Sequence, residues 1–368
     1  MNARARTPRT AALLSGLVAA LTLTACGAGE VQTPESPDDA GGTAGGGTAS
    51  GGCPVGEPDE SVETTVRIAY QDIPNGDLLV KQEGLLEACL PNATIEWNKF
   101  DSGGSVVQAF GSGSADIGLA GSSPAVKAMS EPLNLDVQAI YIYDVIGDAE
   151  SLVVKDESIT DVEGLRGKKI AVPFSSTAHF SLLKILQDEG LESEVELINL
   201  SPDAMVAAFD RGEIDGAWVW APTLPELVGA GGTPILSNAD AAERGFATFD
   251  MAIGSTPFVE DNPEFMQMWT RVQDHASTQI NENPQEAAES IAAALGLEPA
   301  AVQDQFPGYE YPDAAAQAGE EYFGGRMGQI LAETASFLAD VGEVDSAESV
   351  DFYTERVYSQ ALETVANG

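Results

Sequence analysis

Two segments of the chain share one pattern, in which an apolar strand leads through small hydroxyl residues directly into the start of a helix. They are residues 116–124 and residues 170–179. A junction of this kind aims free backbone N–H groups and Ser/Thr hydroxyls at one point, and the helix dipole makes that point attractive to an anion. One such junction is also typical of an ordinary helix cap. Two of them predict the two walls of a cleft that binds a small oxyanion through uncharged donors.

Strand and helix signals alternate along the chain, which is typical of open, mainly parallel α/β sheets. We expect strands at residues 66–70, 93–97, 116–119, 137–141, 151–155, 169–172, 195–200, 214–220 and 249–253. We expect helices at residues 76–88, 105–110, 177–187, 320–341 and 350–365, and helices that begin at Pro124, Pro202, Pro263 and Pro284.

The pattern restarts after residue 155, so the 368 residues are interpreted as two α/β lobes, the second inserted in the first. Lobe 1 comprises residues 62–150 and 250–368, and lobe 2 comprises residues 151–249. Segments 151–155 and 249–253 are interpreted as crossings between the lobes. Ligands of such sheets bind at the carboxyl ends of strands, where both hydroxyl-rich junctions lie.

The N-terminus has the pattern of a processing segment. Three arginines among the first nine residues precede an apolar run at 11–23, which is short for a membrane span, and the residues up to Cys26 resemble a bacterial lipobox. We predict a lipoprotein signal peptide at 1–25 and lipidation of Cys26, which would anchor the protein outside the cytoplasmic membrane. A plain secretory signal is the alternative. Residues 26–61, rich in Gly, Thr, Pro and acidic side chains, are predicted to form a flexible tether.

Two cysteines, Cys53 and Cys89, remain once Cys26 carries lipid. An even number of cysteines in an oxidising compartment suggests one disulfide, which would tie the end of the tether to the first helical region. Two free thiols are the alternative, because a sequence does not show proximity.

The chain is strongly acidic, with 58 Asp and Glu against 17 Lys and Arg and a formal net charge of −41. Such a charge argues against nucleic acid and anionic lipid surfaces as ligands. Long-range attraction also cannot recruit an anionic ligand, so short-range donors must select it. The acidic surface itself is ordinary for solubility in salt.

Five further residues are candidates for the cleft. Gln71 ends the first strand and can offer an amide donor. His179 lies in the first turn of its helix, where the dipole disfavours the protonated form, so a neutral or packing role is expected. The indole of Trp220 can donate a hydrogen bond or cover a cation, with core packing as the alternative. Glu150 and Asp250 can pair with an ammonium group, with solvated surface as the alternative.

Several classes of site are not indicated. The histidines and cysteines have no metal-ligand spacing, and there is neither a nucleotide-binding glycine fingerprint nor a P-loop. A Gly-x-Ser-x-Gly elbow and a plausible Cys/His nucleophile pair are also missing from the sequence. We therefore expect no metal, no cofactor and no enzymatic activity.

Five segments resemble the taurine-binding proteins, which belong to the taurine, nitrate and sulfonate branch of periplasmic substrate-binding proteins for ABC importers. They are residues 69–71, 99–103, 117–124, 170–179 and 211–222. The resemblance implies a bilobed, periplasmic-binding-protein-like α/β fold of type II, with two open sheets, a hinge and a ligand cleft. It also implies a protein that closes on one ligand and presents it to a membrane permease with its ATPase. We expect the protein to be a monomer.

The resemblance also implies roles for individual residues. The sulfonate side would be lined by Gln71, Ser122, Ser123, Ser176, Thr177 and His179, with the amides around Gly121 as further donors and Trp220 alongside. Glu150 and Asp250 match acidic positions where an amine could sit. Ala178 stands where a hydroxyl is common in the taurine-like pattern, which removes one donor.

The resulting hypothesis is a lipid-anchored receptor for taurine or a close aminosulfonate. A sulfonate has three acceptors and stays ionised, so it needs several donors at once. One alternative is a receptor for an alkanesulfonate, nitrate or a thiamine-precursor pyrimidine. Another is a desulfinase-like enzyme of the same fold, which would need a cysteine in the cleft.

Overall fold

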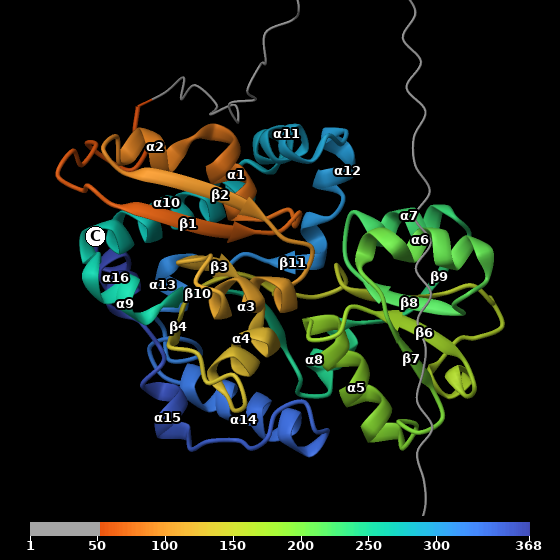
Figure 1. Cartoon of the computed structure of the whole chain (residues 1–368). Helices are drawn as coiled ribbons and strands as arrows, with labels where there is room; N and C mark the ends of the chain where they lie inside the picture. The colour runs from red at the N-terminus through yellow and green to blue at the C-terminus, as the bar shows by residue number, and fades with distance from the viewer. Residues whose placement is uncertain (1–51) are drawn as a thin grey trace, which may run out of the picture. The chain divides into compact units, whose positions relative to one another are not determined.

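The structure is a computed structural model that describes residues 52–368. The predicted signal peptide, the predicted lipidation site Cys26 and the tether up to residue 51 lie outside the described residues. The described residues contain two open β-sheets, each accompanied by helices (Figure 1). We call the six-stranded sheet and the helices packed on it lobe 1, and the five-stranded sheet with its helices lobe 2.

The sheet of lobe 1 has the strand order β11-β4-β10-β3-β1-β2. Its strands are β1 (Thr65–Tyr70), β2 (Thr94–Lys99), β3 (Ile117–Leu119), β4 (Val137–Ile146), β10 (Thr248–Ser255) and β11 (Tyr309–Glu310). β1 pairs in parallel with β2 and β3, whereas β10 runs antiparallel to β3 and β4, and β11 antiparallel to β4. The returning strand β10 therefore lies in the middle of the sheet.

The sheet of lobe 2 has the order β7-β6-β8-β5-β9. Its strands are β5 (Ser151–Val154), β6 (Lys169–Val172), β7 (Glu196–Asn199), β8 (Gly216–Val219) and β9 (Thr233–Ser237). β6 pairs in parallel with β7 and β8, while β5 runs antiparallel to β8 and β9.

The interpretation of segments 151–155 and 249–253 as crossings is wrong. β5 pairs on both sides within lobe 2, and β10 pairs on both sides within lobe 1. Their apolar side chains are buried on the faces of these sheets, which favours a central position in the sheet over a crossing segment. The chain instead passes between the sheets in residues 147–150 and 244–247. The lobe boundaries drawn from the sequence stay a prediction.

Sixteen α-helices and two short 3-10 helices complete the described chain. The α-helices are α1 (Gly76–Glu83), α2 (Leu85–Cys89), α3 (Gly103–Gly111), α4 (Ser122–Met129), α5 (Thr177–Glu189), α6 (Pro202–Arg211), α7 (Thr223–Gly229), α8 (Asn238–Glu243), α9 (Thr256–Asp261), α10 (Pro263–Glu282), α11 (Pro284–Leu295), α12 (Pro299–Gln303), α13 (Ala314–Gln317), α14 (Met327–Asp340), α15 (Val350–Thr354) and α16 (Gln360–Ala366). The 3-10 helices are η1 (Val162–Leu165) and η2 (Phe306–Gly308).

Two expected helices are divided in the structure. The helix expected at 76–88 breaks at Gly84, whose φ of 65° ends α1 in the left-handed conformation that glycine adopts readily. The helix expected at 350–365 separates into α15 and α16. The helices expected from Pro263 and Pro284 do begin at these prolines, as α10 and α11.

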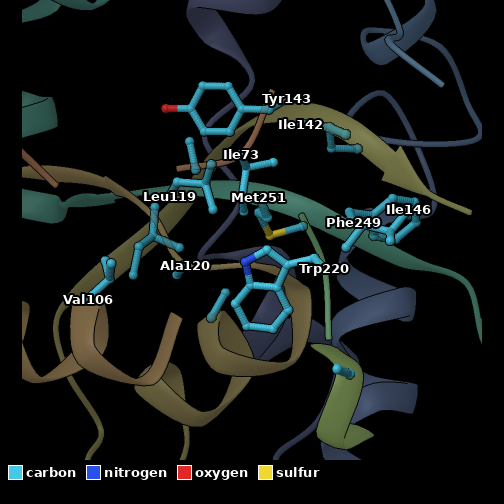
Figure 2. Packing of buried hydrophobic residues seen from close by; sticks show 14 of the residues in the cluster. Ile73, Val106, Leu119, Ala120, Ile142, Tyr143, Ile146, Trp220, Phe249 and Met251 are labelled. Atoms are coloured by element: carbon cyan, nitrogen blue, oxygen red, sulfur yellow. The ribbon is translucent and has the colours of Figure 1, made fainter. Parts of the chain in front are cut away.

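The longest helix, α10, packs its apolar face against the sheet of lobe 1. Trp269 is fully buried there and meets the rings of Tyr141 and Tyr143 edge-on, at centroid distances of 5.7 and 6.3 Å. The same core extends to the lobe 2 residue Trp220, which shares one apolar cluster with Met251 of β10 (Figure 2). The apolar core is therefore continuous from one lobe to the other.

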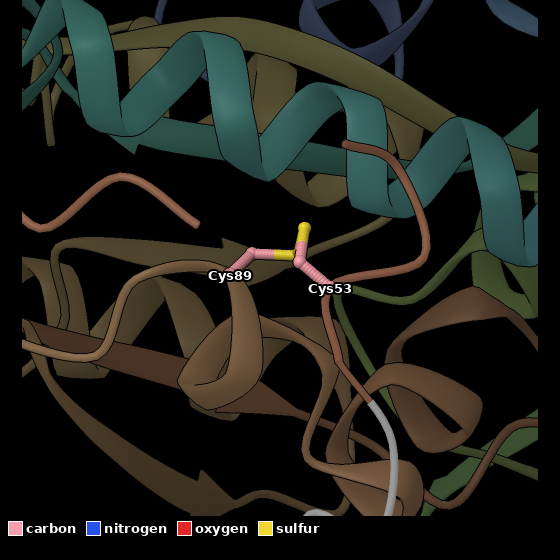
Figure 3. Close-up of a disulfide and its surroundings, with 2 residues drawn as sticks. All are labelled: Cys53 and Cys89. Carbon is pink, nitrogen blue, oxygen red and sulfur yellow. A yellow bond between two sulfur atoms is a disulfide. The ribbon is translucent and has the colours of Figure 1, made fainter. Parts of the chain in front are cut away.

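Cys53 and Cys89 are joined by a disulfide, with an S–S distance of 2.02 Å (Figure 3). Close by, the N–H of Asp59 donates to the carbonyl of Cys89 at 2.8 Å, and the amide of Asn92 donates to the carbonyl of Glu60 at 2.7 Å. The last residues of the predicted tether are thus held against α2. In residues 52–368 no helix has both the length and the apolar character needed to cross a bilayer.

Candidate functional site

The two hydroxyl-rich junctions, one from each lobe, lie side by side. Ser123, in the first turn of α4, donates its hydroxyl to the backbone carbonyl of Ser176 at 3.1 Å, and Ser176 is the residue before α5. Gly121 precedes α4 with a φ of 82°, and a Cβ built on it would lie 3.0 Å from the Thr177 methyl group. The two helix N-termini therefore meet at one place between the lobes.

The donors at this place are uncharged. The first N–H groups of a helix have no partner within it, so those of Ser122, Ser123 and Thr177 are available unless another group binds them. The side chain of Ser176 accepts from the N–H of His179 at 3.0 Å. Ser122 Oγ accepts from the N–H of Phe249 at 3.3 Å and keeps its own hydrogen for donation. Backbone and hydroxyl donors from both lobes thus remain for an anion.

Gln71 is buried at the end of β1, as expected from its position. Its Nε2 donates to the carbonyl of Leu119 at 2.9 Å, while its Oε1 is buried without a hydrogen-bond partner. The side chain therefore has both an unused acceptor and a second amide hydrogen.

His179 is a neutral imidazole in this environment. It is buried in the first turn of α5, stacked on Phe174 at a centroid distance of 4.5 Å, and its Nδ1 accepts from the N–H of Ser175 at 3.4 Å. Burial lowers its pKa from 6.5 to about 4. With Nδ1 as acceptor, Nε2 carries the proton and is the ring's donor.

Glu150 is already engaged with lobe 2. Its Oε1 accepts from the hydroxyl of Thr177 and its Oε2 from the amide of Asn238, both at 2.6 Å. The indole N–H of Trp218 in turn donates to Asn238 Oδ1 at 3.1 Å. Burial, followed by the charge of Asp250, raises the pKa of Glu150 from 4.5 to about 8. The Thr177 hydroxyl therefore already donates to Glu150, and the backbone N–H of Thr177 is the donor that remains for a ligand.

Asp250 lies opposite a second carboxylate that the sequence analysis missed. Asp250 of β10 and Asp144 of β4 are cross-strand partners, and their exposed fractions are 4% and 0%. Burial raises the pKa of both groups, and for Asp144 the charge of Asp250 is the next cause. Asp144 is a single acidic residue within the apolar run 139–146, which is the signal that could have drawn attention to it.

Other buried polar groups surround this pair without being paired. Four buried polar atoms make no hydrogen bond of normal geometry: both carboxyl oxygens of Asp144, the Nδ2 of Asn75 and the hydroxyl of Tyr143. Asn75 and Asp144 are fully buried and Tyr143 is 1% exposed. Since buried polar groups in proteins are normally satisfied, these groups are the part of the site best suited to contact polar atoms of a ligand.

Trp220 directly follows β8 and is buried among Met251, Phe249 and other apolar residues (Figure 2). Trp218, two residues earlier, is fully buried in lobe 2. Trp220 is thus the tryptophan nearer the meeting of the lobes, as its place at the strand end suggested.

A lysine also bridges the lobes outside this cluster. Lys127 of α4 donates to Ser175 Oγ at 2.7 Å and contacts Glu343 at 2.6 Å. It lines a groove of about 620 Å³ to which lobe 1 contributes Ser102 and Gln108, and lobe 2 contributes Phe174 and Asn199. Nothing in the sequence near Lys127 indicates this bridge, because its partners Ser175 and Glu343 are distant in the chain.

No group of three or more His, Cys, Asp or Glu side chains in residues 52–368 is placed to hold a metal ion.

Comparison with known proteins agrees with the fold. The alkanesulfonate-binding protein SsuA from Xanthomonas axonopodis pv. citri, solved bound to MOPS, aligns with a TM-score of 0.66 at 23% identity, covering 81% of this chain and 99% of that one. The periplasmic aliphatic sulphonate binding protein SsuA from Escherichia coli aligns with a TM-score of 0.63 at 22% identity, covering 82% and 100%. The described residues thus have the bilobed α/β fold of periplasmic binding proteins, as predicted.

Sequence comparison supplies the family. The profile described as NMT1/THI5 like matches residues 95–287. The taurine-binding periplasmic protein of Escherichia coli (strain K12) is 34% identical over 278 residues, which are 74% of this chain and 84% of the relative. The chain belongs to the NMT1/THI5-like family, and the predicted resemblance to taurine-binding proteins is confirmed.

Proposed function

We propose that this protein is an extracytoplasmic receptor that binds taurine or a close aminosulfonate and delivers it to an ABC permease with its ATPase. The observation that carries the proposal is the meeting of two helix N-termini, bridged by Ser123 and Ser176 at 3.1 Å, with buried carboxyl groups nearby. A zwitterion with an anionic and a cationic end matches these two chemistries. The taurine-binding and putative aliphatic sulfonates-binding relatives support the same ligand class.

The sulfonate would bind at the helix N-termini. The N–H groups of Ala120 and Gly121 already donate to the carbonyl of Met251, so Gly121 itself offers no donor. Three sulfonate oxygens need several donors, and the N–H groups of Ser122 and Ser123, the hydroxyl of Ser122 and the Nε2 of His179 are uncharged donors of the right kind. Ser123, Ser176 and Thr177 hold the two helix starts together and contribute backbone N–H groups. Because no cation is required, the net negative charge of the protein does not conflict with an anionic ligand end.

The ammonium group would bind among the carboxyl groups. Asp250 is the first candidate, because both oxygens of Glu150 already accept hydrogen bonds from Thr177 and Asn238. Trp220 can cover the cation with its ring. Gln71, with its unused acceptor, can receive an N–H of the ammonium. Closure of the lobes would exclude water and strengthen both sets of contacts.

The cellular setting of the proposal follows the sequence predictions. A signal peptide at 1–25 and a lipid on Cys26 would tether a monomer outside the membrane, close to the permease. A Cys26→Ala variant should then leave the membrane fraction, as cell fractionation would show. A binding role is also favoured over a thiol-dependent enzyme, since both cysteines in residues 52–368 are joined in one disulfide.

Calorimetric titration with taurine, ethanesulfonate, sulfate and nitrate tests the function. We expect heat with taurine, weaker binding of ethanesulfonate, and no binding of nitrate at the same concentrations. Binding of nitrate alone, or of no sulfonate, would contradict the proposal. Tight binding of alkanesulfonates with no preference for taurine would move the assignment to an alkanesulfonate receptor, as the relatives named for aliphatic sulfonates suggest.

A further inference from the structure

Resting on the proposed function, we infer that Asp144 and Asp250 form a carboxyl pair that shares one proton in the unliganded protein and exchanges this proton for the ammonium group of the incoming zwitterion. The pair would make Asp144 a specificity-determining residue, selecting cationic ligands over uncharged ones of the same shape.

The geometry of the sheet brings the two carboxyl groups together. β4 and β10 are antiparallel, and Asp144 and Asp250 are directly paired across them. Residues opposite each other in an antiparallel pair project to the same face, with Cβ atoms about 4.5–5.5 Å apart. Two buried carboxylates at such a separation cannot both ionise without a cation between them.

The titratable groups around the pair are acidic or phenolic, so none of them supplies a cation. When ionised, Asp250 and Glu150 in the crossing segment each oppose the ionisation of Asp144. Asp77 of α1 faces Tyr143, and it accepts from the amide of Gln273 at 2.8 Å. Tyr309 of β11 and Tyr311 after it are the other titratable groups near the pair, and the tyrosines face it as neutral phenols. In residues 52–368 no ion pair joins Asp144, Glu150 or Asp250 to a lysine or arginine.

Unpaired buried atoms mark the pair as a binding element. Neither oxygen of the fully buried Asp144 accepts a hydrogen bond from a backbone N–H or from a basic side chain in residues 52–368, and only the side chains of Asn75 and Asp250 lie against it. Asn75 lies against Asp144, and its Oδ1 caps α1 by accepting from the N–H of Asp77 at 3.2 Å. A buried carboxylate that receives no hydrogen bond is strongly disfavoured, so its oxygens require a proton or a cation. An ammonium group has three donors and can satisfy such oxygens.

The exchange balances in charge and atoms. Before binding, one carboxylic acid and one carboxylate carry a net charge of −1. On binding, the carboxylic acid releases its proton to the solvent, and the two carboxylates together with the ammonium again carry −1. The cation side of the site therefore keeps its charge of −1, so no additional charge is desolvated there, while the sulfonate brings its own negative charge to the helix N-termini. A ligand without an ammonium group has nothing to replace the proton, which stays on the pair.

Proton release during binding tests the inference. Calorimetric titrations of the full chain with taurine, in buffers with different ionisation enthalpies at the same pH, measure the number of protons released. Between pH 6 and 8 we expect close to one proton per taurine, and an affinity that rises by up to about tenfold per pH unit. Ethanesulfonate, which lacks only the ammonium group, should bind without proton release and without this rise.

The outcomes separate the inference from the proposed function. If taurine binds with no proton release and a flat pH profile, the shared proton is refuted while the receptor function stands. If neither taurine nor ethanesulfonate binds, the proposed function fails, and the inference fails with it.

Substitutions assign the proton to the pair. The amide of Asp144→Asn imitates the protonated carboxyl, so taurine should bind the variant at least about tenfold more weakly at pH 8, with the release of protons lost. Its affinity for ethanesulfonate should change by less than about threefold, which also shows that the variant is folded. Asp274→Asn is a matched control, because Asp274 is a half-buried carboxylate bonded to the N–H of Ala314 at 2.6 Å. Undiminished proton release by Asp144→Asn would overturn the assignment, and the measurement on the native chain decides the matter should this variant not fold.

Discussion

The two ends of the proposed ligand are served by differently built regions. The anion side is formed by the N-termini of α4 and α5, which belong to different lobes and are bridged by Ser123 and Ser176. The cation side is formed by Asp144 and Asp250, on neighbouring strands of a single sheet. The anion side therefore forms only when the two lobes are in contact. The carboxyl pair lies within lobe 1 and does not depend on the position of lobe 2. Substitutions on the anion side should affect all ligands, and those on the cation side only cationic ones.

The largest expected effect separates the two sides directly. Asp250→Asn should lower the affinity for taurine by about 30-fold or more, because hydrogen bonds to charged groups contribute about 1.5–3 kcal/mol. Ethanesulfonate, which has no cationic end, should lose little. Parallel calorimetric titrations with both ligands measure the difference, and equal losses would remove the distinction between the two sides.

A substitution on the anion side should show no such selectivity. Gly121→Ala places a side chain at a φ of 82°, with its Cβ 3.0 Å from the Thr177 methyl group. Strained left-handed backbone costs about 1–3 kcal/mol, and α4 would also be pushed away from α5. We expect the affinities for taurine and for ethanesulfonate to fall by the same factor, about tenfold or more. A change confined to taurine would contradict this interpretation of the junction.

The bridge by Lys127 should matter less. Lys127→Met keeps most of the aliphatic length but removes the contacts with Ser175 and Glu343. The side chains of the ion pair are partly exposed, by 17% for Lys127 and 25% for Glu343. For a partly exposed pair we expect a loss of about 0.5–1 kcal/mol, seen as a two- to fivefold weaker affinity for both ligands. The matched control is Arg211→Met, which removes an exposed ion pair with Glu213 within lobe 2. Identical behaviour of the two variants would show that the Lys127 bridge does not favour the ligand-bound arrangement.

The smallest effect concerns stability without ligand. The pKa of Glu150 is raised from 4.5 to about 8 in the folded chain, so the folded state binds this proton more tightly than the unfolded state. The resulting stabilisation is complete below the unfolded pKa and is lost as the pH rises through about 8. His179, whose pKa is lowered to about 4, acts in the opposite direction, but only below its unfolded value of 6.5.

Between pH 6.5 and 8.5, thermal unfolding therefore reports on the buried carboxyl groups without a contribution from His179. The melting temperature of the unliganded protein should fall across this range, and Glu150→Gln should reduce the fall. A melting temperature that is independent of pH in the native chain would contradict the protonated state of the buried cluster.

The anion side was predictable because its information is local. Each junction is a contiguous run of strand, small hydroxyl residues and helix start, and these runs fold as the sequence indicates, with α5 beginning at Thr177. The same holds for β6 at Lys169–Val172 and for the ends of helices at Gly190 and Gly212. Capping and strand–helix signals operate over a few residues and need no knowledge of the rest of the chain.

The cation side was only partly predictable because it depends on strand register. Nothing near Asp144 in sequence shows that Asp250 will pair with it, since the pairing follows from the return of the chain between β3 and β4. The engagement of Glu150 with Thr177 and Asn238 likewise joins three separate segments. The same limit explains why residues 249–253 were interpreted as a crossing rather than as part of a central strand.

Paired calorimetric titrations with taurine and ethanesulfonate at pH 8 decide whether the site has separate anion and cation sides, because these ligands share the sulfonate and differ in the ammonium group. We predict that both bind and that taurine binds at least about tenfold more tightly, with proton release only for taurine. Equal affinities would contradict the cationic side of the site, and no binding of either ligand would contradict the receptor for small sulfonates altogether.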